Sequence, residues 1–187
     1  MVELRKQIKS EGVVLKRTNY GEADRIVTLY TKHYGKLVCL AKGTRRTSSK
    51  KRASIELFSQ IRFYAVSGRG LDILAETEII DSFTNIRKDL VKISSAYQLC
   101  ELVDRLTVEK NDQEVIYFQL VKALEQISNS ENQESEEIVY EFAGNLVKEL
   151  GFWPKEKALP TGISLFSFIE DTIERRLKSK SLLKNFH

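Results

Sequence analysis

One stretch of this 187-residue chain concentrates positive charge with no acid to offset it. Between Asp24 and Glu56 there is no aspartate or glutamate, whereas nine of the 31 intervening positions are lysine or arginine. Those nine cations are Arg25, Lys32, Lys36, Lys42, Arg45, Arg46, Lys50, Lys51 and Arg52. A field of this kind favours binding to a phosphate backbone, because each neutralised phosphate releases counterions.

The densest part of the stretch reads KGTRRTSSKKR at 42–52 and intersperses its charges with Gly, Ser and Thr. We expect an adjustable loop between two strands, whose side chains adapt to a polynucleotide backbone. Neighbouring segments add Arg17, Arg62 and Arg69. A solvated loop without any ligand is the alternative. The predicted DNA-binding residues are Arg17, Arg25, Lys42, Arg45, Arg46, Lys50, Lys51, Arg52 and Arg69.

Aromatic residues lie close in sequence to these cations and offer rings on which bases can stack. They are Tyr20, Tyr30, Tyr34, Phe63 and Tyr64. Several of these rings must fill a hydrophobic interior. Tyr20 and Tyr34 are therefore the stacking candidates.

The sequence offers little for catalysis. His33 and the terminal His187 are the only histidines, so no Ser-His-Asp or Cys-His arrangement is indicated. The sequence SGRGLD at 67–72 lacks the spacing and the GK[ST] of a phosphate loop, which argues against ATP as a ligand. It is better explained as a hairpin turn with Arg69 at its tip. We therefore predict a protein that is not an enzyme and that has no cofactor.

The cysteine and histidine content argues against a metal centre. Cys39 lies in an apolar run typical of a strand, and Cys100 lies on the apolar side of a predicted helix. A zinc site would have to gather these two residues and the two histidines from distant positions. We predict that both cysteines are core residues, and we assign no metal ligands.

The segments that must position the basic stretch have the period of β-strands. Apolar residues alternate along five segments of the first 80 residues, with turn residues between the segments. The predicted strands are 12–18, 25–31, 37–41, 55–66 and 71–80. Five such strands suit a small closed barrel, which leaves no exposed sheet edge, and an OB-fold is the leading candidate.

From Asp81 onward the apolar period becomes that of a helix. A long amphipathic helix is predicted to begin there and to carry Leu90 and Leu106 on its apolar face. A second helix is predicted to begin at Asn111 or Asp112, since either side chain suits an N-cap.

Two more helices complete the predicted all-helical part. One begins with Ser135 as its N-cap and ends at Gly151, and the other covers 163–177. Residues 1–80 hold 16 basic and 8 acidic side chains, a charge of +8, whereas residues 81–187 hold 14 and 18, a charge of −4. We therefore predict a DNA-binding OB-fold domain at 1–80 and a helical domain at 81–187 with different partners.

The location is indicated by what the sequence lacks. No apolar run approaches the roughly 20 residues that span a bilayer, and the first residues show no signal-peptide pattern. We expect a cytoplasmic, nucleoid-associated monomer that makes no membrane contact.

Two long segments stand out by their order and spacing: GVVLKRTNYGEADRIVTLYTKHYGKLVCLAKGTRR at 12–46, followed by ELF, and GRGLDILAETEIID at 68–81. They resemble the N-terminal domain of the RecO family of bacterial recombination mediators. LVKELGFWP at 146–154 is similar to the family's helix that ends in an aromatic-Pro turn, and RRLKSKSLLKNF at 175–186 to its terminal segment. Together these segments cover most of the chain, and the middle helices match only as a pattern.

The resemblance implies an OB-fold and a helical domain that bind single- and double-stranded DNA and anneal complementary strands. It also implies contacts with RecR and with the C-terminal tail of the single-strand-binding protein, which help to load RecA onto coated DNA. Arg25, Lys42, Arg45 and Arg46 fall within the matching segments and are the best-supported contacts. The basic residues at 50–52 lie in a more variable part.

The chain departs from the family in one respect. Many members have a four-cysteine zinc motif after the aromatic-Pro turn, whereas residues 154–163 read PKEKALPTGI. We also expect a chain shorter than typical members, with the loss in the helical half, which leaves the partner contacts of that half open.

Two other functions stay open from the residues alone. A generic OB-fold RNA-binding module would carry the same charge pattern. A metal-dependent nuclease would use Glu22 and Asp24, which lie together near a predicted turn.

Overall fold

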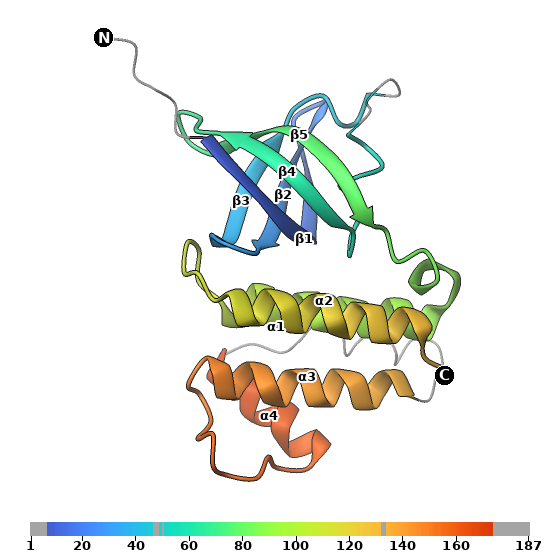
Figure 1. The fold of residues 1–187 in the computed structure, drawn as a ribbon, viewed down its shortest axis with the longest axis vertical. Coiled ribbons are helices and arrows are strands. Elements are labelled where there is room, and N and C mark those ends of the chain that lie inside the picture. The colour runs from blue at the N-terminus through green and yellow to red at the C-terminus, as the bar shows by residue number, and fades with distance from the viewer. Residues whose placement is uncertain (1–6, 47–48, 50, 132–133, 174–187) are drawn as a thin grey trace. The chain divides into compact units, whose positions relative to one another are not determined.

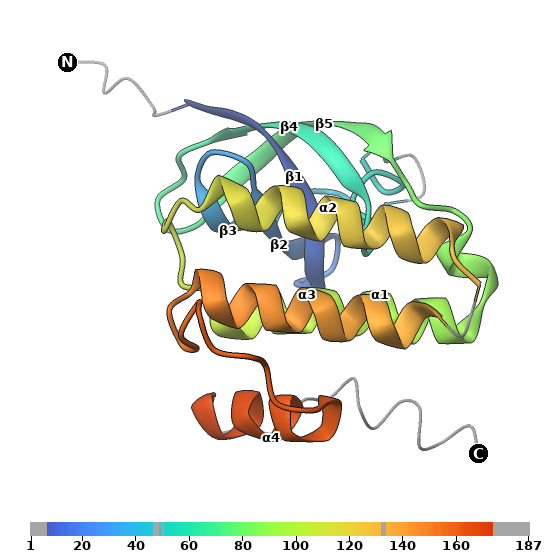
Figure 2. The ribbon, with the colours of Figure 1, turned by 60° about the horizontal axis from the view of Figure 1, so that its bottom comes forward.

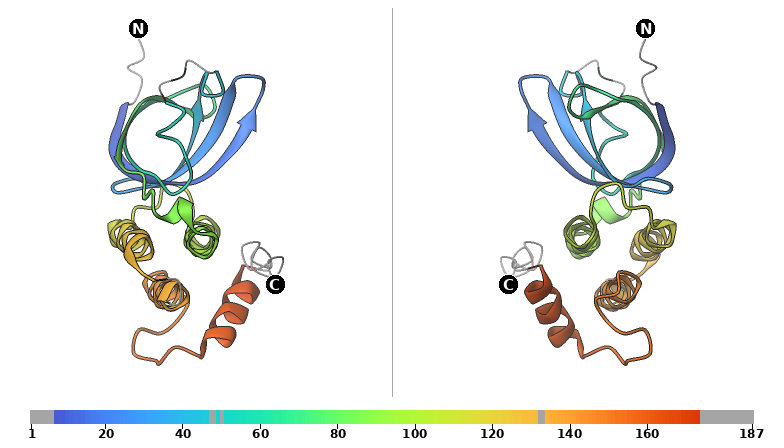
Figure 3. Two further views of the ribbon diagram at one scale, coloured as in Figure 1. Left: turned by 90° about the vertical axis from the view of Figure 1, so that its right-hand side faces the viewer. Right: turned by 90° about the vertical axis from the view of Figure 1, so that its left-hand side faces the viewer.

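Five strands form a closed barrel in the first part of the chain. The computed structural model describes residues 7–46, 49, 51–131 and 134–173 (Figure 1). The strands are β1 (Gln7–Tyr20), β2 (Asp24–Thr31), β3 (Gly35–Ala41), β4 (Gln60–Val66) and β5 (Asp72–Asp81). Their order around the barrel is β1-β2-β3-β5-β4, with β3 and β5 parallel and the other neighbours antiparallel. This confirms the predicted OB-fold, and Figure 3 shows the strands curving around an interior.

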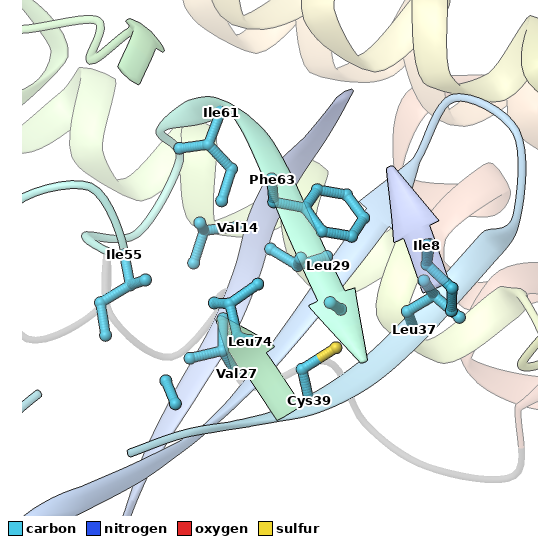
Figure 4. Close-up of a cluster of buried hydrophobic side chains, with 12 residues drawn as sticks. Ile8, Val14, Val27, Leu29, Leu37, Cys39, Ile55, Ile61, Phe63 and Leu74 are labelled. Atoms are coloured by element: carbon cyan, nitrogen blue, oxygen red, sulfur yellow. The ribbon is translucent and has the colours of Figure 1, made fainter. Parts of the chain in front are cut away.

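Alternation along the strands builds that interior. On β3, Leu37, Cys39 and Ala41 are buried while the residues between them are only partly buried. Figure 4 shows side chains from all five strands gathered in one cluster. The cluster comprises Ile8, Val14, Val27, Leu29, Leu37, Cys39, Ala41, Ile55, Ile61, Phe63, Ala65 and Leu74.

Both cysteines are core residues, as predicted. Cys39 and Cys100 are free thiols and are buried. Burial raises the pKa of the Cys39 thiol to about 12 and also raises the pKa of Cys100. Both side chains therefore stay neutral near pH 7 and behave as small apolar groups.

The predicted strand at 55–66 is wrong in its first part, because β4 begins only at Gln60. Phe58 has a φ of +71°, which no strand residue adopts. Its N–H donates to the Val14 carbonyl at 2.9 Å, and the Val14 N–H donates to the Ser59 carbonyl at 3.0 Å. β1 has a bulge directly after Val14. These apolar residues are buried because they pack against the bulged strand, not because they extend β4.

The chain divides into two compact units that do not follow sequence order. The first holds the chain up to Ser82 together with Val108–Tyr117, and the second holds Phe83–Thr107 and the chain from Phe118 onward. The division at residue 80 into two domains stays a prediction.

The returning segment Val108–Tyr117 lies against the turn between β2 and β3. The Lys110 N–H donates to the Lys36 carbonyl at 3.1 Å, and the Tyr30 hydroxyl donates to the Gln113 carbonyl at 3.3 Å. Backbone groups at this end of the barrel are therefore satisfied by the chain itself.

Gly35 is required where this segment crosses the turn. Its φ is +60°, in the left-handed region that favours glycine. A Cβ at this position would lie 2.1 Å from the Asn111 carbonyl oxygen. Any side chain would therefore displace the returning segment.

The second unit is built from helices (Figure 2). The elements are the short 3₁₀ helix η1 (Ile86–Lys88) and the α-helices α1 (Leu90–Leu106), α2 (Glu114–Asn129), α3 (Ser135–Glu149) and α4 (Gly162–Thr172). The first turn of α2, up to Tyr117, belongs to the first unit. α3 packs against both α1 and α4. The predicted OB-fold followed by helices is confirmed as the fold class.

The first helix does not begin at Asp81, as the apolar period predicted, because β5 continues to that residue. α1 begins at Leu90, and Asp89 is its N-cap. The Asp89 side chain accepts hydrogen bonds from the N–H groups of Val91 and Lys92 at 2.8 and 3.2 Å. This N-cap ends the extended backbone and begins the helix. Leu90 is consequently exposed instead of lying on the apolar face.

Two other helix boundaries differ from the prediction. α2 begins at Glu114, two or more residues after the proposed caps Asn111 and Asp112. α4 begins at Gly162, and the predicted end at 177 lies outside the described residues. Within the described part of the chain, no helix is both long and apolar enough to cross a bilayer.

The ends of α3 show one correct and one incorrect prediction. Ser135 is the buried first residue of the helix and not its N-cap, which is Glu134 and makes no side-chain cap bond. Gly151 has a φ of +77°, which confirms it as the residue that ends the helix.

Candidate nucleic-acid interface

Two loops meet at the end of the barrel where β2 begins and β3 ends. The Arg45 N–H donates to the Ala23 carbonyl at 2.9 Å, and Arg45 Nη1 donates to the Gly21 carbonyl at 2.8 Å. The Gly43 N–H donates to Asp24 Oδ1 at 2.7 Å. The start of the basic segment is therefore fixed to the β1–β2 loop.

The strand register brings two predicted arginines to one face. Arg17 pairs with Val27, and Arg25 pairs with Asn19, in the antiparallel ladder of β1 and β2. Since alternate residues share a face, Arg17 and Arg25 lie diagonally across the ladder on the same side as the buried Val27. The two arginines thus continue the inward-facing row of side chains toward the loops.

Two carboxylates lie near these positive charges: Glu56, and Asp24, whose Oδ1 accepts from the Gly43 N–H. Arg17 Nη1 forms an ion pair with Glu56 Oε1, and the two side chains are 26% and 34% exposed. Burial lowers the pKa of Arg25, the positive charges of Arg17, Arg52 and Arg45 lower it further, and Glu56 opposes them. We call Arg17, Arg25, Arg45 and Arg52 the arginine cluster. Its four guanidinium groups leave an excess of positive charge even when both Glu56 and Asp24 are counted.

Arg25 has an unmet hydrogen bond. Its Nη1 is buried and has no acceptor among the described residues. A charged donor without an acceptor is destabilising by at least about 1–3 kcal/mol in a buried place. An oxygen of a bound phosphate would satisfy it.

Three further predicted cations are exposed. Lys42 and Arg46 belong to the same segment as Arg45, and Arg69 lies in the separate turn between β4 and β5. Lys50 lies outside the described residues. The structure therefore brings together Arg17, Arg25, Arg45 and Arg52, with Lys42 and Arg46 beside Arg45 in sequence.

The far end of the basic segment is anchored to the barrel. Lys51 Nζ donates to the Leu74 carbonyl at 3.0 Å, and the hydroxyls of Ser54 and Thr77 share a hydrogen bond. Burial lowers the pKa of Lys51. The segment was expected to be adjustable as a whole, but its two ends are fixed, and the Lys51 ammonium already has an acceptor.

Arg62, which the sequence suggested as a further cation, is neutralised. Its Nη1 lies 2.8 Å from Glu78 Oε2, and its Nη2 lies 3.4 Å from Glu11 Oε1. The hydrogen bond to Glu78 raises the pKa of Arg62. This part of β4 therefore presents acids in excess.

The aromatic residues divide into core and surface. Tyr30 and Phe63 are buried, and Tyr34 packs against the barrel core. Tyr64 is partly buried on β4, whereas Tyr20 is 53% exposed at the end of β1. Of the two stacking candidates, Tyr20 is the one with an open ring.

The two acids considered for a nuclease do not form a metal site. Asp24 accepts a hydrogen bond from Gly43, and Glu22 is exposed in the β1–β2 loop. In the described ranges, no three His, Cys, Asp or Glu side chains gather where they would hold a metal ion. The arrangement gives no support to the nuclease alternative.

Sequence reasoning did not identify Glu56 as a member of this site. Glu56 lies 39 positions from Arg17 and marks only the end of the acid-free stretch. No local pattern indicates that its carboxylate turns back toward β1.

Comparisons with known proteins cover both units. Residues 4–83 match the family described as Recombination protein O N terminal, and residues 87–158 match Recombination protein O C terminal. Similar curated proteins are named DNA repair protein RecO. The one from Symbiobacterium thermophilum is 38% identical over 144 residues, which cover 77% of this chain and 56% of that protein.

Two further relatives agree with this result. The protein from Listeria monocytogenes is 32% identical over 146 residues, covering 78% of this chain and 56% of the relative. The protein from Shouchella clausii is 38% identical over 126 residues, covering 67% and 49%. This chain therefore spans about half the length of the curated relatives it matches.

Proposed function

This chain belongs to the recombination protein O (RecO) family, and from that premise we propose that its barrel binds single- and double-stranded DNA in DNA repair. The predicted contacts are Arg17, Arg25, Arg45 and Arg52, with Lys42 and Arg46 beside them and Lys50, Lys51 and Arg69 as further predictions.

One observation carries this proposal: the four cations of the arginine cluster outnumber the nearby carboxylates of Glu56 and Asp24, and Arg25 has a buried donor without an acceptor among the described residues. Phosphate oxygens accept hydrogen bonds from guanidinium groups in paired geometry. The β1–β2 loop, to which the basic segment is bonded, is also one of the loops through which OB-folds bind oligonucleotides. Charge and position thus support the same ligand.

The outer face of β2 and β3 offers no exposed aromatic ring on which a base could stack. Ile26, Val38 and Leu40 alternate with the core residues there and are partly exposed. Tyr30 is the aromatic residue of these two strands, and it is buried. A strand held through its backbone keeps its base edges free, and neutralised phosphates repel a second strand less. Annealing of complementary strands then needs no active site, and we propose a protein without catalytic activity.

The partners follow from the family and belong to this proposal. We infer a recombination mediator that, with RecR and the tail of the single-strand-binding protein, helps to load RecA onto coated DNA. The barrel at 1–80 would bind DNA, and the helices at 81–187 would contact proteins. We place this monomer in the cytoplasm, at the nucleoid.

A titration of labelled single-stranded DNA tests the proposal. Fluorescence anisotropy with an oligonucleotide of about 20 nucleotides, longer than one OB-fold covers, should give saturable binding. Repeating it between about 50 and 300 mM salt should weaken the affinity steeply, because counterions are released on binding. A competing structured RNA that displaces the DNA preferentially would favour the RNA-binding alternative, and the absence of saturable binding would refute the proposal.

A further inference from the structure

Glu56 holds a place in the arginine cluster that resembles the place of a ligand. It is the first acid after the stretch of nine cations, and its Oε1 accepts from Arg17 Nη1. Across the β1–β2 ladder from Arg17 lies Arg25, whose buried Nη1 has no acceptor among the described residues. A carboxylate and a phosphate offer the same kind of oxygen pair to a guanidinium.

The backbone around Glu56 is held by buried neighbours, whereas its side chain is partly exposed and held by one ion pair. The neighbouring Ile55 is fully buried in the barrel core, and Ser54 is bonded to Thr77. The Glu56 side chain is 34% exposed and bonds to Arg17 alone among the described residues. The carboxylate can therefore leave the cluster by rotation of its side chain, without any change in the barrel.

We propose that Glu56 occupies a phosphate-binding position between Arg17 and Arg25, and that a DNA phosphate takes its place on binding. This inference rests on the proposed function and deepens it. Glu56 competes with the phosphates of DNA for Arg17. The Arg17 guanidinium therefore becomes available to DNA only when a phosphate displaces the carboxylate. Arg25 contributes the donor that the carboxylate does not satisfy.

The influence of Glu56 on the pKa of Arg25 agrees with this arrangement. Burial and three neighbouring arginines lower the pKa of Arg25, and Glu56 is the group that opposes them. A phosphate at the same place would oppose them in the same way.

The opposite role for Glu56 makes a different prediction. If its carboxylate only orients Arg17 for DNA, removing the charge would free Arg17 to move and would weaken binding. If it competes with phosphate, removing the charge strengthens binding. The sign of the change in affinity therefore separates the two roles.

The experiment compares Glu56→Gln with Glu78→Gln in the full chain. Glu78 also pairs with an arginine, Arg62, on the same barrel but away from the arginine cluster, so Glu78→Gln controls for the loss of one negative charge. Binding of a labelled deoxythymidine oligonucleotide is measured over a range of salt concentrations. We expect Glu56→Gln to tighten binding about three- to fivefold, because the Arg17–Glu56 ion pair no longer has to be broken. We expect Glu78→Gln to change the affinity less than about twofold. The salt slope of Glu56→Gln should stay close to that of the wild type, because the same phosphate contacts form in both complexes once the carboxylate has been displaced.

A second variant covers a failure of Glu56→Gln to fold, which thermal unfolding would reveal. Glu56→Asp keeps the net charge and withdraws the carboxylate by one methylene, so its affinity should also exceed that of the wild type. Affinities at or below that of the wild type in these variants, or equal gains in Glu56→Gln and Glu78→Gln, would overturn the inference while DNA binding by the wild type still stands. No binding by any of the proteins would remove both proposals.

Discussion

The two ends of the β2–β3 pair differ in how their polar groups are satisfied. At the closed end, which comprises the turn around Gly35 and the segment Val108–Tyr117, backbone groups bond to the returning chain. At the basic end, which comprises the arginine cluster and its loops, the guanidinium groups outnumber the carboxylates of Glu56 and Asp24. The first arrangement contributes to stability, whereas the second leaves bonding capacity for a ligand at some cost in stability.

The largest expected effect concerns the glycines at the two ends. Gly35→Ala should lower the free energy of unfolding by about 3 kcal/mol, because the new Cβ meets the Asn111 carbonyl in addition to the strain of a positive φ. Gly43→Ala, also at positive φ but with open space around it, should lower it by about 1 kcal/mol. Urea denaturation measures both values. Equal losses would show that the returning segment does not constrain the closed end.

The next effect concerns DNA affinity. Arg45→Ala/Arg46→Ala should weaken binding about tenfold and lower the salt slope by about 1.4, the value for two phosphate contacts on a single strand. Lys32→Ala/Lys36→Ala removes two charges at the closed end, where Lys32 pairs with Glu114 at 3.8 Å, and should change affinity less than about threefold. Anisotropy titrations with matched salt series compare the two. An unchanged slope in the arginine double variant would count against the basic end.

Arg25→Met should separate stability from binding. Replacing a charge that has an unmet donor by an apolar chain of similar length should raise the free energy of unfolding by about 1 kcal/mol. The same change should weaken DNA binding several-fold. Denaturation and anisotropy on the same preparation test this. A loss of stability would mean that Arg25 is a structural residue.

The smallest effect is a pH dependence at the closed end. Burial, and then the charge of Asp112, raise the pKa of Tyr30 to about 12 from its ordinary value of 10.0. The folded state thus favours the neutral phenol, so its contribution is complete below pH 10 and is lost as the pH rises toward about 12. Tyr30→Phe should lose about 0.5–1 kcal/mol at pH 7, the value of one hydrogen bond, and should show a shallower alkaline decline. Unfolding curves at several pH values check this, and parallel declines would contradict it.

Much of the barrel could be predicted from the sequence, because its determinants are local. Alternation of apolar residues sets β2 and β3, and glycine at positive φ ends α3. The predicted strand over 55–59 is wrong because its determinants are not local. A local pattern cannot show that Phe58 and Ser59 bond to a bulge in a distant strand. The helical spacing of Ile86, Leu90 and Ile93 predicts a helix from Asp81 onward, whereas the backbone of Asp81 remains paired with Gln60 of β4.

The candidate site was predictable as a region but not as a set of partners. The lack of acids between residues 24 and 56 located the basic end. Which cations keep their charge available depends on carboxylates and carbonyls far away in sequence, such as Glu78 beside Arg62 and the Leu74 carbonyl beside Lys51. Ion pairing across the barrel is set by register, which composition does not contain.

The parallel contact between β3 and β5 closes the barrel with two residue pairs, Cys39 with Asp72 and Leu40 with Ile73. This short contact, the seam of the barrel, should open locally more often than the other strand pairs. Its amide hydrogens should exchange with solvent sooner than those of the long β1–β2 ladder. Lys51 crosses from the basic segment to the Leu74 carbonyl, one residue beyond the seam. The basic segment, which we propose to bind DNA, is thereby also bonded to the strand that closes the barrel. Binding of DNA to this segment should therefore slow the opening of the β3–β5 contact.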